Sequence, residues 1–112
     1  MRTVPVLALA GALLALLATA AVAATARVEI GDNYFVHKGG RPTVTVNRGD
    51  TVRWVWTGKN IHNVTVRSGP VRFGSRTQKK GTYARKMTRP GRYVIYCTVH
   101  GYPTQTMTLV VR

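Results

Sequence analysis

Short runs of alternating apolar and polar residues, separated by Gly, Pro, Asn and Asp, are the feature that most limits how this chain can fold. Beyond the apolar N-terminus, no segment has the periodicity of a long helix. Alternating runs between closely spaced turn residues are typical of strands in a β-sandwich. We expect an all-β fold of about seven to eight strands from the runs Arg27–Ile30, Tyr34–His37, Thr43–Asn47, Thr51–Thr57, Ile61–Arg67, Gly81–Met87, Gly91–Cys97 and Thr106–Arg112.

The N-terminus has the layout of a secretory signal peptide. Arg2 precedes the apolar run Val4–Leu17, and small residues in three Ala-x-Ala patterns follow. We predict a signal peptide over residues 1–26, with cleavage after Ala23 or Ala26, and a single mature domain over residues 27–112. The alternative is an uncleaved membrane anchor, because the apolar run is almost long enough to span a bilayer. Either reading predicts export to the periplasm, the cell surface or the outside of a bacterium.

The charge is strongly positive. The chain has 17 Lys and Arg against three acidic residues, a net charge of +14. Such a field favours acidic partner proteins, anionic membranes or anionic wall polymers. It would also bind nucleic acid nonspecifically, but export excludes nucleic acid as a specific partner. A solvated basic surface without a dedicated partner is the other interpretation.

One cysteine and two histidines are candidate metal ligands. Cys97, the only cysteine, lies three residues before His100, and His62 lies on an earlier predicted strand. A single cysteine cannot form an intramolecular disulfide, so its role is metal binding or inert burial. One thiolate and two imidazoles form the equatorial ligand set of blue copper sites, although a structural zinc site uses the same groups. By alternation, Asn63 faces away from His62, where it would hydrogen-bond the ligand loop.

Three sequence patterns carry a resemblance to a known family. They are G-D-T-V-x-W-x-W over Gly49–Trp56, H-N-V over His62–Val64, and P-G-x-Y-x-x-Y-C-T-x-H over Pro90–His100. Together with a terminal strand, they resemble the cupredoxins, in particular plastocyanin- and pseudoazurin-like blue copper proteins. The resemblance covers essentially all of residues 27–112. It implies a Greek-key sandwich with one type-1 copper, held equatorially by His62, Cys97 and His100. It also implies electron entry and exit at the exposed imidazole edge of His100.

The axial position departs from the family pattern, in which a methionine follows the second histidine. Plastocyanin-like spacing from His100 leads to Gln105, and a loop two residues longer leads to Met107. Because the two residues are two apart, both face inward and alternation does not separate them. We predict Gln105, since glutamine replaces the weak axial methionine in stellacyanin-like cupredoxins. An amide oxygen is harder than a thioether and should lower the reduction potential.

These patterns favour a monomeric electron carrier that exchanges electrons with other redox proteins. We expect these partners to have acidic docking surfaces. A copper-delivery protein or a basic β-sandwich binding module are the alternatives. An enzyme is not expected, because three histidines cannot build the additional copper centres of multicopper oxidases or nitrite reductases. The third histidine, His37, is expected to be an exposed polar residue.

Overall fold

The computed structural model describes residues 2–3, 22–40 and 42–112. These residues form eight strands: β1 (Thr25–Gly31), β2 (Tyr34–His37), β3 (Thr43–Val46), β4 (Thr51–Trp56), β5 (Thr65–Ser68), β6 (Gly81–Lys86), β7 (Gly91–Tyr96) and β8 (Thr106–Val111). The apolar run of the predicted signal peptide or anchor, Val4–Leu17, lies outside the described residues. Among the described residues, no helix has the length and apolar character of a membrane span.

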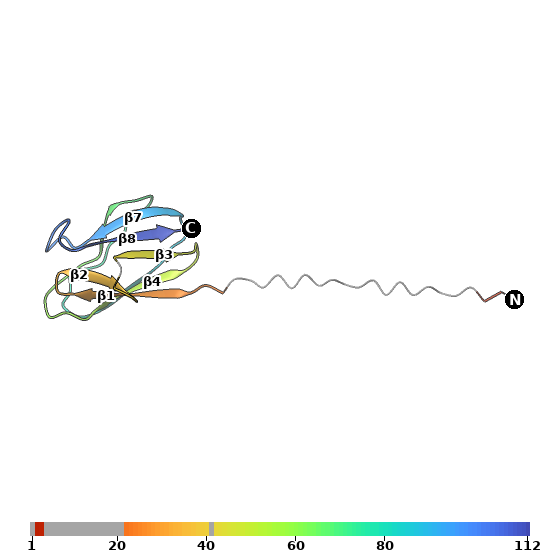
Figure 1. The fold of residues 1–112 in the computed structure, drawn as a ribbon, viewed down its shortest axis with the longest axis horizontal. Helices are drawn as coiled ribbons and strands as arrows, with labels where there is room; N and C mark the ends of the chain where they lie inside the picture. Colours follow the sequence, from red (N-terminus) through yellow and green to blue (C-terminus); the bar gives the residue numbers. More distant parts are fainter. Residues whose placement is uncertain (1, 4–21, 41) are drawn as a thin grey trace.

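The strands form two four-stranded sheets packed face to face (Figure 1). One sheet has the order β2-β1-β4-β6, and the other has the order β3-β8-β7-β5. Pairing is parallel between β1 and β4 and between β3 and β8, and antiparallel elsewhere. The expected all-β sandwich is therefore confirmed.

The core lies between the two sheets and follows the alternation in the sequence. Val52, Trp54 and Trp56 of β4 are buried on one face, as their spacing predicts. Tyr93 and Leu109 are fully buried on the facing sheet. Burial of such large side chains is the main stabilising contribution in a domain of this size, at about 1.5–3 kcal/mol each.

The predicted strand Ile61–Arg67 is wrong in its first half. β5 begins only at Thr65, and His62 pairs with Gln78 in an isolated bridge. The physical reason is that the intervening backbone is hydrogen-bonded elsewhere. The N–H of Asn63 donates to Cys97 Sγ, and that of Val64 donates to Ser75 Oγ. The segment that carries His62 is thus held by side chains and one bridge rather than by a regular ladder.

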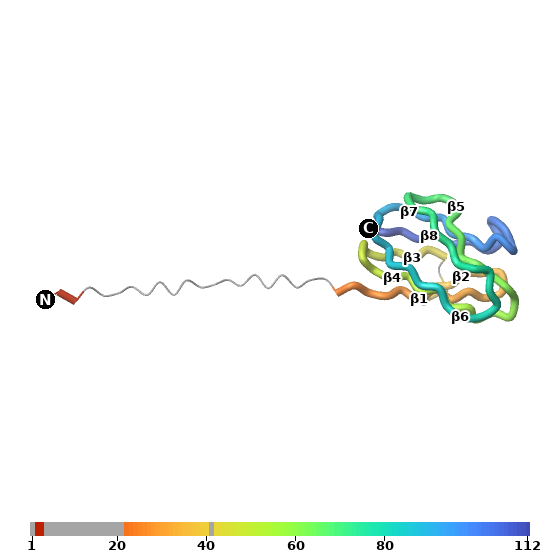
Figure 2. Tube along the Cα trace, turned by 180° about the vertical axis from the view of Figure 1, so that it is seen from behind, coloured from red at the N-terminus to blue at the C-terminus, as the bar shows by residue number. Residues whose placement is uncertain are grey.

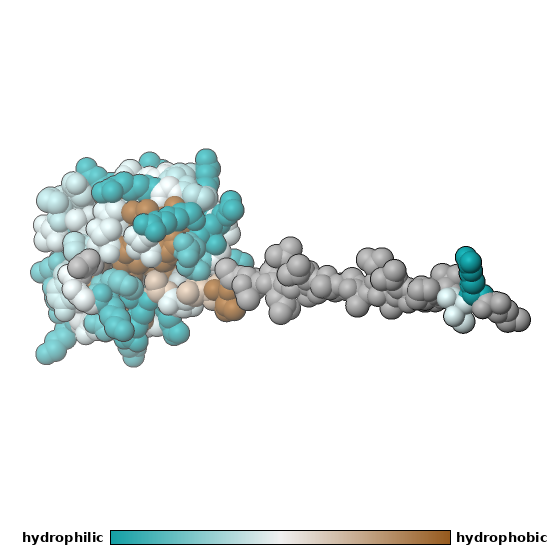
Figure 3. Space-filling model, turned by 45° about the vertical axis from the view of Figure 1, so that its right-hand side comes forward, coloured by the Kyte–Doolittle hydropathy of each residue, from teal (hydrophilic) through white to brown (hydrophobic). Residues whose placement is uncertain are grey.

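The loops that carry the candidate ligands gather at one end of the sandwich. The turn between β1 and β2, the connection from β4 to β5 and the loop from β7 to β8 lie at the end opposite residue 22 (Figures 1 and 2). Figure 3 brings the end near residue 22 forward. The face that it shows is mostly hydrophilic around a small apolar area. This arrangement separates the entry of the chain from the candidate site.

The first strand begins before the predicted domain boundary at residue 27. Thr25 and Ala26 pair with Thr51 and Val52 of β4. The backbone N–H of Ala24 donates to Asp50 Oδ1 at 2.9 Å. This hydrogen bond, together with one from the N–H of Asn47, lowers the pKa of Asp50. Residues 24–26 therefore belong to the folded domain.

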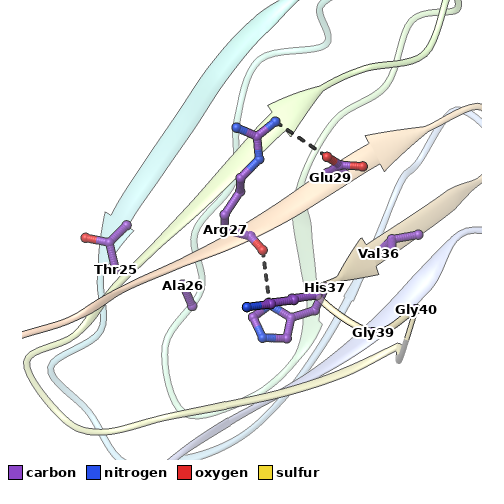
Figure 4. Close-up of a pocket in the computed structure, with 9 residues that line it drawn as sticks. Thr25, Ala26, Arg27, Glu29, Val36, His37, Gly39 and Gly40 are labelled. Carbon is purple, nitrogen blue, oxygen red and sulfur yellow. Dashed lines mark hydrogen bonds and ion pairs between the residues drawn. The ribbon is translucent and has the colours of Figure 1, made fainter.

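His37 lies away from the other two histidines, in a cleft of about 570 Å³ between β1 and the β2–β3 turn (Figure 4). Its Nδ1–H donates to the backbone carbonyl of Arg27 at 3.0 Å. Glu29, the acidic side chain lining this cleft, pairs instead with the Arg27 guanidinium. The cleft therefore offers no set of converging metal ligands around His37.

Candidate metal centre

The structure brings His62, Cys97 and His100 into one cluster. One ligand atom from each residue lies within 4.8 Å of the others. Cys97 Sγ is 3.7 Å from His100 Nδ1. His62 and Cys97 are fully buried, whereas His100 is half-buried. The cluster thus has an inner part shielded from water and one imidazole that reaches the surface.

Two backbone features place the ligand atoms. Cys97 directly follows β7, and the Gly101 N–H donates to the Cys97 carbonyl at 2.9 Å, which closes a turn around His100. His62 exchanges two backbone hydrogen bonds of 3.0 Å with Gln78. Because both anchors are backbone hydrogen bonds, the positions of these residues are set by the fold before any metal binds.

Gln105 completes the cluster. Its Oε1 lies 2.9 Å from His62 Nδ1 and 3.1 Å from His100 Nδ1. Its Nε2 donates to the backbone carbonyls of Gly31 and Tyr34, at 3.1 and 3.2 Å. Since only the amide nitrogen can donate to these carbonyls, the amide is oriented with its oxygen toward both imidazoles.

Met107 lies in the core instead. It is the second residue of β8 and pairs with Ile95. Its sulfur accepts a hydrogen bond from Trp54 Nε1 at 3.4 Å. The two sequence candidates therefore have different surroundings, Gln105 among the imidazoles and Met107 between the sheets.

These donors fit one copper ion. A soft thiolate favours Cu(I), and imidazoles accept both oxidation states. Both Nδ1 atoms lie within 3.1 Å of Gln105 Oε1, and Cys97 Sγ is 3.7 Å from His100 Nδ1. A structural zinc site would share the thiolate and imidazoles, but such sites rarely include an amide oxygen.

Comparison with solved structures agrees with a copper site in this fold. No protein-family model matches the chain, and no curated protein matches it in sequence. A methionine-to-glutamine variant of amicyanin in its Cu(I) form is 28% identical, with a TM-score of 0.65, over 79% of this chain and 82% of amicyanin. A reduced tryptophan-to-tyrosine variant of amicyanin is 27% identical, with a TM-score of 0.63, over 77% and 80%. The chain has the cupredoxin fold.

A copper-containing nitrite reductase from Thermus scotoductus SA-01 has the same fold in part. The match has a TM-score of 0.64 and 22% identity, and it covers 81% of this chain but only 22% of the reductase. At this identity the likeness concerns the fold alone. The β-sandwich described here thus resembles one portion of a larger enzyme as well as the small amicyanins.

Asn63 ties the segments that carry His62 and Cys97 together, as predicted. Its Nδ2 donates to Thr98 Oγ1 at 2.7 Å, and its Oδ1 accepts the Thr98 N–H at 3.0 Å. Its own N–H donates to Cys97 Sγ at 3.4 Å. A donor at the sulfur stabilises the thiolate form, which is the form that binds metals.

Asp32 was not found from the sequence. Its Oδ1 lies 2.9 Å from His62 Nε2, on the side of the ring opposite the cluster. The pKa of Asp32 is lowered to about 2, chiefly by the hydrogen bond with His62. The backbone N–H groups of Asn60 and Lys59 are the smaller causes. The sequence signal available was slight: Asp32 is one of only three acidic residues and follows a predicted strand.

Three exposed apolar side chains and one arginine lie next to the ligand residues in the sequence or against the ligand loop. Ile61, Val99 and Tyr102, which neighbour the ligands in sequence, are all exposed. The Arg67 guanidinium lies 3.7 Å above the Tyr102 ring. This cation–π contact holds a positive charge against the ligand loop. We call these four residues the site rim.

Proposed function

We propose that this chain is an exported electron carrier with one type-1 copper. His62, Cys97 and His100 are its equatorial ligands, and Gln105 is its axial ligand. The observation that carries the proposal is the convergence of Cys97 Sγ and the two Nδ1 atoms beside Gln105 Oε1. When bound, copper would accept and release single electrons between Cu(II) and Cu(I). The residues supply a rigid cage for both states.

The rigidity comes from contacts that do not involve metal. His62 is held by the hydrogen bond between its Nε2 and Asp32 and by its two backbone hydrogen bonds with Gln78, all of which leave Nδ1 free for the metal. Cys97 is held by its position at the end of β7 and by the Asn63 N–H. Ligands fixed in this way move little when the charge of the site changes, which favours fast electron transfer.

Gln105 is favoured over Met107 as axial ligand because of where its donor atom lies. Gln105 Oε1 faces both imidazoles, whereas Met107 Sδ is occupied by Trp54. For Met107 to reach the cluster, β8 would have to shift by two residues against β7, moving Leu109 and Val111 along the core. Such a register change would disrupt every inward contact of the strand.

Electron carriage is favoured over enzyme activity. All three histidines of the chain are described, and His37 lies apart from the cluster, bonded to the Arg27 carbonyl. Among the described residues, one group of three metal-ligating side chains is present. A second copper centre for substrate would need further ligands.

We propose the site rim as the docking surface for an acidic redox partner. The exposed apolar side chains would exclude water around the half-buried His100, through which the electron passes. Arg67 and the net charge of +14 attract anionic surfaces. Because the chain has 17 Lys and Arg against three acidic residues, its long-range field is positive.

Oxidation of the Cu(I) protein by small reagents tests this field. With anionic ferricyanide, the rate should fall steeply as ionic strength rises, and with a cationic cobalt phenanthroline oxidant it should rise. Arg67→Gln should slow the ferricyanide reaction several-fold, whereas Arg53→Gln, on the outer face of the other sheet, is the matched control. Equal effects of the two substitutions would contradict the proposal that the site rim is the docking surface.

Export is proposed with cleavage after Ala23. Cleavage after Ala26 would remove two residues of β1 and the Ala24 donor to Asp50. Cleavage after Ala23 would instead convert the Ala24 nitrogen into an α-ammonium group beside the Asp50 carboxylate. Mass spectrometry of the protein from the periplasm or medium should give Ala24 as the first residue. A chain that begins at Arg27, or an intact chain retained in the membrane, would contradict this.

The proposed function is tested by adding one equivalent of Cu(II) to the domain over residues 24–112. We expect an intense thiolate-to-copper absorption band in the red and an EPR spectrum with narrow parallel hyperfine splitting. These features require Cys97 and both imidazoles on one ion. A pale tetragonal copper spectrum or no binding would leave the chain as a basic β-sandwich binding module.

A further inference from the structure

We infer that Asp32 is a positioning residue of the metal centre, which fixes His62 from behind and favours the oxidised state of the site. The inference rests on the proposed function. It is carried by the 2.9 Å contact between Asp32 Oδ1 and His62 Nε2. Asp32 comes from the turn between β1 and β2, whereas His62 comes from the connection between β4 and β5. The contact therefore joins two loops that are distant in sequence.

The carboxylate is itself held in place. The Lys59 N–H donates to both carboxylate oxygens at 3.0 Å, and the Asn60 N–H donates to Oδ1 at 3.0 Å. A Cβ atom at Gly58 would overlap Asp32 Oδ1, so the absence of a side chain there lets the loop close around the carboxylate. Asp32 is thus a fixed acceptor rather than a flexible surface side chain.

This acceptor decides which nitrogen of His62 is free for a metal. A carboxylate can only accept, so His62 Nε2 carries a hydrogen. Nδ1, on the opposite side of the ring, then faces Cys97, His100 and Gln105 as the ligand atom. Carboxylates behind metal-bound histidines fix the ring orientation and raise the basicity of the ligand nitrogen.

The negative charge also acts on the redox equilibrium. Of the three acidic residues, only Asp32 contacts a residue of the cluster. His62 is fully buried and the Asp32 side chain is 35% exposed, so the pair lies at the boundary of the protein interior. Oxidation adds one positive charge to the site. The carboxylate should therefore stabilise Cu(II) relative to Cu(I) and lower the reduction potential.

Asp32→Asn is the direct test, because it removes the charge but keeps an oxygen that accepts from His62. Glu29→Gln is the matched control, since it removes the same charge from β1 on the outer face of the sheet. We expect Asp32→Asn to keep the blue band and to lower the ratio of Cu(II) to Cu(I) association constants by about tenfold. This change corresponds to a rise of about 59 mV in reduction potential. Glu29→Gln should leave the potential close to that of the wild type.

Proton NMR of the copper-free and Cu(I) proteins gives a second readout. The His62 Nε2–H should appear as a downfield, slowly exchanging resonance that moves upfield in Asp32→Asn, and Asp32→Glu should restore most of the wild-type potential. Equal potentials in Asp32→Asn and Glu29→Gln would overturn the inference while the blue spectrum still stood. If Asp32→Asn does not fold, a wild-type His62 Nε2–H that exchanges as fast as a free imidazole would overturn it.

Discussion

Cys97→Ser should abolish the blue colour of the copper-loaded protein. The red absorption band arises from charge transfer between thiolate and copper, and a serine hydroxyl at neutral pH cannot supply it. Loss of a residue that only supports a metal ligand lowers metal affinity by about 10–100-fold. Loss of the Cys97 thiolate itself should lower copper affinity by more than this. Visible absorption and EPR measure the loss of the thiolate-to-copper site, and a competition titration with a chelator measures the loss of affinity.

The fold should survive this substitution. Serine is close to cysteine in volume, and its oxygen can accept the hydrogen bond that Asn63 donates to Sγ. Circular dichroism of the copper-free variant should therefore match the wild type. His37→Asn, which removes the histidine remote from the cluster, should keep the full band. Blue colour in Cys97→Ser, or its loss in His37→Asn, would contradict the ligand assignment.

Gln105→Met should raise the reduction potential, whereas Met107→Leu should leave it unchanged. A thioether is a softer ligand than an amide oxygen and favours Cu(I). We expect the ratio of Cu(II) to Cu(I) affinity to fall by at least about tenfold, which raises the reduction potential by at least about 59 mV. Met107→Leu conserves volume but leaves the buried Trp54 N–H without its acceptor, so it should cost about 1–3 kcal/mol of stability. Cyclic voltammetry and EPR of both variants separate the two positions.

Each substitution also has an effect on stability that serves as a control. Gln105→Met leaves the carbonyls of Gly31 and Tyr34 without the Nε2 donor, at a cost of about 1–3 kcal/mol for each group that stays dry. Met107→Leu loses the Trp54 hydrogen bond. Denaturant unfolding therefore detects both changes. A potential that moves in Met107→Leu and not in Gln105→Met would assign the axial role to Met107.

The strands and the ligand cluster were largely accessible from the sequence. Alternation is a local property, so the buried face of β4, with Trp54 and Trp56, follows directly from the residue order. The short spacing from Cys97 to His100 makes their proximity a consequence of one turn. The hydrogen bonds of Asn63 were also predictable, because a residue next to a buried ligand must satisfy its polar groups.

The features that were missed depend on contacts between distant segments. Asp32 meets His62 only because the turn between β1 and β2 folds over the connection from β4 to β5. The late start of β5 results from Ser75 and Cys97 accepting hydrogen bonds that a strand would have used. Alternation also could not separate Gln105 from Met107, because the choice depends on the register of β8 against β7.

The two carbonyls that receive the Gln105 amide bear on how such a site can change during evolution. A lineage that replaced this glutamine by methionine in one step would leave the Gly31 and Tyr34 carbonyls without the amide donor. A protein that had changed only the axial residue would be less stable than the proteins before and after it, unless the turn between β1 and β2 changed too. Among descendants of this chain, the axial residue and the turn between β1 and β2 are therefore expected to vary together rather than independently.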